Sequence, residues 1–236
     1  DIIEGFRHRL FWPALRLSLG TSLISLGFVV VLGTPLAWWL AHVSVSKRRM
    51  LNAWVDLPML LPPSVIGLGL LLSFGRHGLL GETLIAFGIH IPLSTSAVVI
   101  AQIVVSSPFY IQSAATAFGR IHPDQILVAQ TLGQNLRGTL WRVVLPLSMP
   151  GLVTGAALCW ARALGEFGAT LLFAGNMPGV TQTMPLAIYT AMESDLNLAQ
   201  ALALLLTGTG LVALLLLRQM PGFWQNEKPQ GKGSKS

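Results

Sequence analysis

The feature that most constrains this chain is a series of long stretches without Asp, Glu, Lys or Arg. They cover residues 17–46, 57–75, 83–119, 143–161, 167–192 and 196–217. A helix needs about 20 apolar residues to cross a bilayer core of about 30 Å, and most of these stretches are long enough. Only 10% of the 236 residues are charged, against about 25% in a soluble domain. The pattern predicts an all-α, polytopic membrane protein.

The apolar stretches are best divided into five membrane spans, at about residues 13–41, 56–74, 94–118, 150–173 and 198–217. Pro58, Pro62 and Pro63 fall in the second span. Proline removes a helix donor and its ring clashes with the preceding turn. We therefore expect the second span to be kinked or broken.

Charge predicts how the chain is oriented. If the N-terminus is outside, ten of the 15 Lys and Arg fall in inside segments, four lie outside and one lies within a span. Lys and Arg concentrate in cytoplasmic loops. We expect a single transmembrane domain over residues 1–218 of a cell (inner or plasma) membrane protein, with the N-terminus outside. Residues 219–236 are expected to form a polar, disordered cytoplasmic tail.

Residues 121–150 form a predicted inside loop that is unusually apolar. Ile126, Ala129, Leu132 and Leu136 recur at helical spacing, and Gly133 interrupts the pattern. An exposed apolar helix face requires a surface that covers it. Composition alone does not decide whether the membrane or a partner protein covers this face.

The same loop resembles the EAA loop of binding-protein-dependent ABC importer permeases, whose pattern is Glu-Ala-Ala, three residues, Gly, nine residues, Ile, one residue, Leu-Pro. The matching positions here are Leu127, Val128, Ala129, Gly133, Val143, Leu145 and Pro146. The spacing agrees throughout, and Leu127 replaces the usual Glu. The resemblance implies a type I ABC importer permease fold in which this loop docks on a cytoplasmic ATPase. The residues implied in ATPase coupling are Val128, Ala129, Gly133, Leu136, Arg137, Val143, Leu145 and Pro146, with Arg137 and Arg142 at the rim.

The fourth span carries small residues at every fourth position. They are Gly151, Gly155, Cys159 and Ala163. Small residues on one helix face allow another helix to approach closely. We expect this ridge to pack against a neighbouring helix.

Arg162 and Glu166 lie four residues apart in the same predicted span. A charged side chain near the bilayer centre costs about 2.5 to 3.5 kcal/mol on insertion scales, so both should face protein or water. One interpretation is an ion pair that fixes helix packing, and the other is a cation in the path of an anionic solute. The ion pair is favoured, because an Arg neutralised by Glu is a weak anion site.

The run from residue 163 to residue 192, with residues 57–72, resembles the molybdate branch of these permeases. Residues 165–170 match its Gly-Glu-Phe-Gly-Ala-Thr signature, and the following outside loop matches at Asn176, Pro178, Gly179, Thr181, Thr183, Pro185, Ala187 and Tyr189. The implied substrate is molybdate, with tungstate beside it, and the related sulfate permeases make sulfate or thiosulfate the alternative. The implied pathway residues are Gly168, Thr170, Asn176, Thr181, Thr183 and Tyr189. Ordinary turn and capping chemistry is the other explanation of the Thr and Asn residues.

No phosphate-binding Walker lysine motif occurs, the five His show no metal-ligand spacing, and Cys159 is a single cysteine. We therefore expect no enzymatic activity, no metal site and no cofactor in this chain, and assign Mg-ATP to a partner subunit. The resemblance implies four partners: a second copy of the chain, a cytoplasmic ABC ATPase dimer, an extracytoplasmic molybdate-binding protein and membrane lipid. The net charge of +6 reports membrane orientation rather than nucleic-acid binding. A membrane-embedded enzyme acting on lipid-linked substrates would need clustered acidic residues, and Glu166 is the only acid deep in a predicted span.

Overall fold

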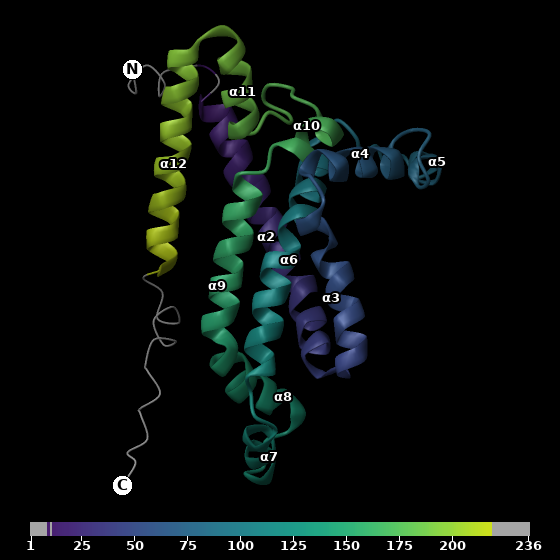
Figure 1. Cartoon of the computed structure of the whole chain (residues 1–236), viewed down its shortest axis with the longest axis vertical. Coiled ribbons are helices and arrows are strands. Elements are labelled where there is room, and N and C mark those ends of the chain that lie inside the picture. Colours follow the sequence, from purple (N-terminus) through teal and green to yellow (C-terminus); the bar gives the residue numbers. More distant parts are fainter. Residues whose placement is uncertain (1–8, 10, 219–236) are drawn as a thin grey trace.

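The computed structural model describes residue 9 and residues 11–218, and in this part of the chain all regular structure is helical. The helices are α2 (Phe11–His42), α3 (Val45–Leu60), α4 (Pro63–Phe74), α5 (Gly81–Ala86), α6 (Thr95–Gly119), α7 (Pro123–Thr131), α8 (Leu136–Thr139), a π-helical turn (Leu140–Val144), α9 (Leu145–Leu164), α10 (Gly168–Ala174), α11 (Met184–Ser194) and α12 (Leu196–Arg218). The long helices run along one axis of the molecule (Figure 1). Helices α4, α5 and α10 lie towards one end, which we call the outer end, and α7 and α8 form the other, the coupling end. The predicted tail, residues 219–236, lies outside the described residues.

Three described helices are long and apolar enough to cross a membrane: α2, α6 and the continuous helix Arg137–Leu164. The pair α3 and α4 also passes this test if it is counted as one bent span. The apolar part of α12 that was tested, Leu196–Val212, is shorter. The all-α membrane fold is therefore confirmed, and the count of five spans stays a prediction.

The proline-rich second span is broken, as expected. Helix α3 ends at Leu60, α4 begins at Pro63, and their axes differ by 105°. Pro63 occupies the first turn of α4, where its missing N–H leaves no helical hydrogen bond unmade. The break turns α4 sideways at the outer end (Figure 1).

The predicted fourth span, residues 150–173, is wrong in both boundaries. The spanning helix begins at Arg137, well before Pro150, and ends at Leu164, and α10 starts only at Gly168. Gly165 is the C-cap of α9. The side chain of Glu166 then accepts a hydrogen bond from the N–H of Ala169, 2.8 Å away, which caps the new helix instead of extending the old one.

Helix α6 packs against both α2 and α9 and so forms the centre of the bundle. A Cβ added to Gly151 would lie 2.4 Å from Cβ of Ala117, and one added to Gly155 would lie 2.7 Å from Cβ of Ser113. Both distances are shorter than a carbon contact allows. The small-residue ridge therefore packs against α6 of the same chain, which confirms the close approach expected from the sequence.

Polar side chains also join these helices inside the bundle. Trp160 Nε1 on α9 donates to Ser22 Oγ on α2 at 3.0 Å. Ser25 Oγ donates to Gln102 Oε1 on α6, also at 3.0 Å. Each bond satisfies a group that could find no partner in lipid, so the three helices are held in one register.

Candidate functional site

The coupling end is built by the segment between α6 and α9. His122 and Gln125 form a capping box at the start of α7, and Pro123 occupies its first turn. The helix ends at Thr131, and Gly133 follows with φ +84°. This left-handed conformation suits glycine and lets the N–H of Gln134 bond to the carbonyl of Ala129 at 3.1 Å.

The apolar residues of α7 divide between two faces. Ala129 is buried with 7% exposure, and Ile126 is half-buried against the bundle core. Leu127, Val128 and Leu132 are 56%, 57% and 77% exposed. The exposed apolar patch is therefore these three residues, and Ala129, expected to take part in coupling, is a packing residue of the loop.

The other residues expected to take part in coupling lie between α7 and the first turn of α9. Arg137 is exposed and lines a shallow hollow with Gln130, Gln134 and Asn135. Val143 and Leu145 are half-buried and Pro146 is exposed. Arg142 donates to Gln134 Oε1 at 3.2 Å, which joins the π-helical turn to the loop that follows α7. The side chain of Leu136 lies outside the described part.

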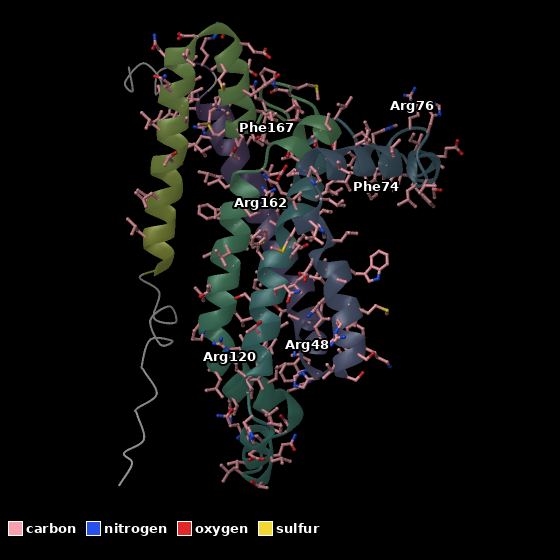
Figure 2. The ribbon with its side chains drawn as sticks, viewed as in Figure 1. Arg48, Phe74, Arg76, Arg120, Arg162 and Phe167 are labelled. Carbon is pink, nitrogen blue, oxygen red and sulfur yellow. The ribbon has the colours of Figure 1, made fainter. Side chains whose placement is uncertain are left out.

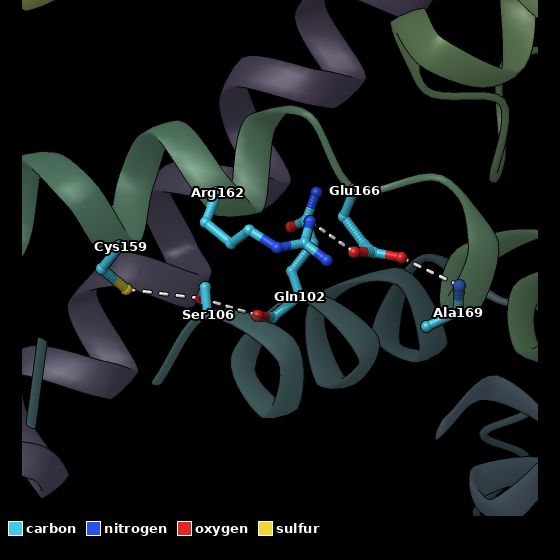
Figure 3. Close-up of polar contacts among 6 residues, drawn as sticks. All are labelled: Gln102, Ser106, Cys159, Arg162, Glu166 and Ala169. Atoms are coloured by element: carbon cyan, nitrogen blue, oxygen red, sulfur yellow. Dashed lines mark hydrogen bonds and ion pairs between the residues drawn. The ribbon is translucent and has the colours of Figure 1, made fainter. Parts of the chain in front are cut away.

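Arg162 and Glu166 form the ion pair that their spacing predicts, with 2.7 Å between Nη1 and Oε2 (Figure 3). The Arg162 side chain is 28% exposed and that of Glu166 is 0% exposed. Their position differs from the expectation, because Arg162 lies in the last turn of α9 and Glu166 in the break that follows. Glu166 thus connects Arg162 at the end of α9 to Ala169 at the start of α10 (Figure 3), and the ribbon with labelled Arg162 and Phe167 shows where the two helices meet (Figure 2).

Helix α10 is packed tightly on α4. A Cβ on Gly67 would lie 2.7 Å from the carbonyl oxygen of Ala169, and one on Gly168 would lie 3.2 Å from the nitrogen of Ser64. Gly67 therefore lies in direct contact with the α10 backbone, and a side chain on Gly168 would require Ser64 to move by a few tenths of an ångström. The side chain of Thr170 is fully buried in the same contact region, and its hydroxyl has no hydrogen-bond partner among the described residues.

The loop between α10 and α11 turns most of its polar groups inward. Thr181 is buried, and its Oγ1 accepts from the N–H of Met177 at 2.9 Å. Asn176 Nδ2 donates to Thr190 Oγ1 at 2.9 Å, and Thr183 is 1% exposed. In the single chain, Thr181 makes a local turn contact and Asn176 joins the loop to α11.

Tyr189, on α11, is the most exposed of the predicted pathway residues. It is 41% exposed, and its ring packs against Phe167 with 5.4 Å between the centroids. A hydrogen bond with Glu193 raises the pKa of Tyr189, because the neighbouring carboxylate opposes ionisation of the phenol.

Sequence reasoning missed a cavity of about 850 Å³ between α3, α6 and α9. Its wall includes Asp56, whose Oδ1 accepts from Gln112 Nε2 at 2.8 Å, together with Thr116 and Arg120. The available signal was the recurrence of polar residues at positions 112, 116 and 120 in an apolar helix. Among the described residues, no group of three His, Cys, Asp or Glu could hold a metal ion.

Residues 33–220 match the family described as binding-protein-dependent transport system inner membrane component. The chain is 46% identical over 202 residues to the molybdenum transport system permease protein ModB of Mycobacterium tuberculosis, covering 86% of this chain and 76% of that protein. It is 35% identical over 207 residues to ModB of Escherichia coli K12, covering 87% and 90%.

Solved structures share the fold at lower identity. A bacterial ABC transporter involved in the import of the acidic polysaccharide alginate matches with a TM-score of 0.73 and 18% identity, over 92% of this chain and 81% of that chain. The MetNI methionine ABC transporter in an inward-facing conformation matches with a TM-score of 0.61 and 19% identity, over 88% and 96%.

Proposed function

The chain belongs to the family of binding-protein-dependent transport system inner membrane components, and we propose that it is the permease subunit of an ATP-driven molybdate importer. The observation that carries this proposal is its similarity to molybdenum permeases along most of its length. Two copies of the chain would form the translocation path. Tungstate, a tetrahedral dianion like molybdate, is expected to use the same path.

The geometry of the coupling end supports an ATPase dimer as the cytoplasmic partner. Leu127, Val128 and Leu132 form an exposed apolar patch at the end of the molecule. The helix that begins at Arg137 runs without a break from this end to Leu164. A movement imposed on the patch by ATP binding would therefore reach the other end of α9 through a rigid element.

The same arrangement fits an outside N-terminus and a cytoplasmic C-terminus. With α7 in the cytoplasm, the layer of α4, α10 and α11 faces the outside, where a molybdate-binding protein would deliver its ion. A binding protein can surround the ion with donors, whereas a path must release it. We therefore assign most of the discrimination between molybdate and sulfate to the binding protein.

The test is uptake by vesicles that contain the complete complex, with ATP trapped inside and the cognate binding protein added outside. Labelled molybdate should accumulate only when both are present, and unlabelled tungstate should compete. Sulfate uptake through the cognate binding protein, with molybdate failing to compete, would contradict the substrate assignment and favour the sulfate alternative. The orientation is tested in intact cells, where an outside label should reach a cysteine introduced at Gly179 and not one introduced at Gln134; labelling at Gln134 would contradict it.

A further inference from the structure

The cavity between α3, α6 and α9 reaches the coupling end. Arg120 at the end of α6 and Gln125 in the first turn of α7 line this part, and Leu60 at the end of α3 and Leu158 of α9 line the opposite part. The part that contains Arg120 therefore lies in the half of the bundle that the proposed orientation places towards the cytoplasm.

One wall of the cavity is a stripe of hydrogen-bond donors on α6. Gln112, Thr116 and Arg120 are each four residues apart, so they share one face and span about 12 Å along the helix. They present an amide, a hydroxyl and a guanidinium group. Arg120 is exposed at the end of α6, next to the coupling segment (Figure 2). Such a series offers a leaving oxyanion several weak contacts in succession.

Asp56 faces this stripe from α3. Its Oδ1 accepts the Gln112 amide hydrogen at 2.8 Å, and it is the one carboxylate among the described residues that line the cavity. The carboxylate thus accepts the hydrogen bond of Gln112, the donor farthest from Arg120, as an oxyanion would. It also places a negative charge at that point.

A hydrogen bond between α3 and α6 does not by itself require a charge. Helix α3 has no buried residue, so the contact of Asp56 with Gln112 helps to hold it in place. An Asn would make the same hydrogen bond without the cost of bringing a charge into a partly desolvated cavity. The carboxylate is therefore best explained by what its charge does to the contents of the cavity.

We propose that the cavity is the exit half of the oxyanion path and that Asp56 promotes release by repelling the dianion towards Arg120. By competing for the Gln112 amide and repelling the ion, Asp56 prevents molybdate from resting in the cavity or re-entering it from the cytoplasm. This role rests on the proposed function as an oxyanion permease.

The experiment uses vesicles of the complete complex with ATP and increasing unlabelled molybdate trapped inside, and binding protein with labelled molybdate outside. The quantity measured is the internal molybdate concentration that halves the initial uptake rate. Asp56→Asn should lower this concentration roughly five- to tenfold, as expected for removing a charge that repels a dianion across a watery cavity. Arg120→Gln should raise it. Glu82→Gln, which removes a carboxylate from α5 far from the cavity, is the matched control and should leave it unchanged.

Thr116→Glu provides a second, opposite test, because it adds a negative charge to the same stripe about 6 Å along α6 from Gln112, and it should raise the half-inhibiting concentration. A value for Asp56→Asn within twofold of the unmodified complex would overturn the assignment. Failure of both variants to assemble would also overturn it, in favour of a purely structural contact between α3 and α6. If the unmodified complex transports sulfate and not molybdate, the substrate assignment fails, and the same measurement with sulfate still tests Asp56.

Discussion

The two ends of the molecule differ in which side chains they expose and which they bury. At the coupling end, large apolar side chains such as Leu132 are exposed, and the loop is fixed by a capping box and a left-handed glycine. At the outer end, small residues allow α4 and α10 to touch, and the hydroxyls of Thr170, Thr181 and Thr183 are buried. Exposed apolar surface outside a membrane requires a partner. The α4–α10 contact is formed within one chain, whereas the exposed apolar patch of Leu127, Val128 and Leu132 has no cover among the described residues.

The largest expected effect comes from breaking the ion pair between Arg162 and Glu166, which joins α9 to the outer end. Arg162→Gln leaves the fully buried Glu166 without its counter-charge and should cost about 3 to 5 kcal/mol of folding free energy. Glu166→Gln should cost less, because the remaining Arg162 is 28% exposed and can reach water. The double variant should recover part of the loss, because no charge is then stranded. Thermal unfolding of the four purified proteins in detergent measures this cycle.

A double variant that costs as much as the two single variants together would contradict the structural role of the pair. An Arg162→Gln protein that folds normally but transports nothing would establish Arg162 as a cation of the translocation path instead. This is the alternative that the sequence leaves open.

The open coupling end is tested by adding charge to its exposed patch. Leu132→Asp should leave folding unchanged and weaken ATPase association at least about 30-fold, as expected when a central interface residue worth about 2 kcal/mol or more is lost. Ala129→Asp is the contrasting variant, because its side chain is 7% exposed and an Asp there must be buried. It should reduce folded yield before docking can be measured. Co-purification with the ATPase and thermal stability separate the two effects.

If Leu132→Asp retains full association and stimulated ATP hydrolysis, the docking surface lies elsewhere on the chain. If Ala129→Asp folds normally and loses only the ATPase, the burial of this residue does not determine its role. Either outcome would remove the contrast between the two ends.

The features that depend on local chemistry could be predicted from the sequence. Prolines at positions 58, 62 and 63 predict the broken second span, and small residues at every fourth position predict the ridge on α9. The break at Glu166 was missed because hydropathy does not distinguish a helix end from a continuing helix when apolar residues flank both. The faces of α7 and the cavity beside Asp56 depend on which helices lie next to each other, and helical periodicity shows that a face exists without showing what covers it.

The smallest expected effect concerns a single glycine in the α4–α10 contact. Gly67→Ala places a Cβ 2.7 Å from the backbone oxygen of Ala169, which cannot move away as a flexible side chain could. The helices must separate, and we expect a loss of about 1 to 3 kcal/mol, reduced by the roughly 1 kcal/mol that alanine gains over glycine inside a helix. Gly69→Ala is the matched control on the same helix, since no atom lies within 4 Å of its added Cβ. This variant should show only the gain in helix stability of alanine over glycine. Thermal midpoints of the two variants should therefore move in opposite directions. Movement in the same direction would mean that α4 and α10 are not held together by close backbone contact, and that the outer end is as open as the coupling end.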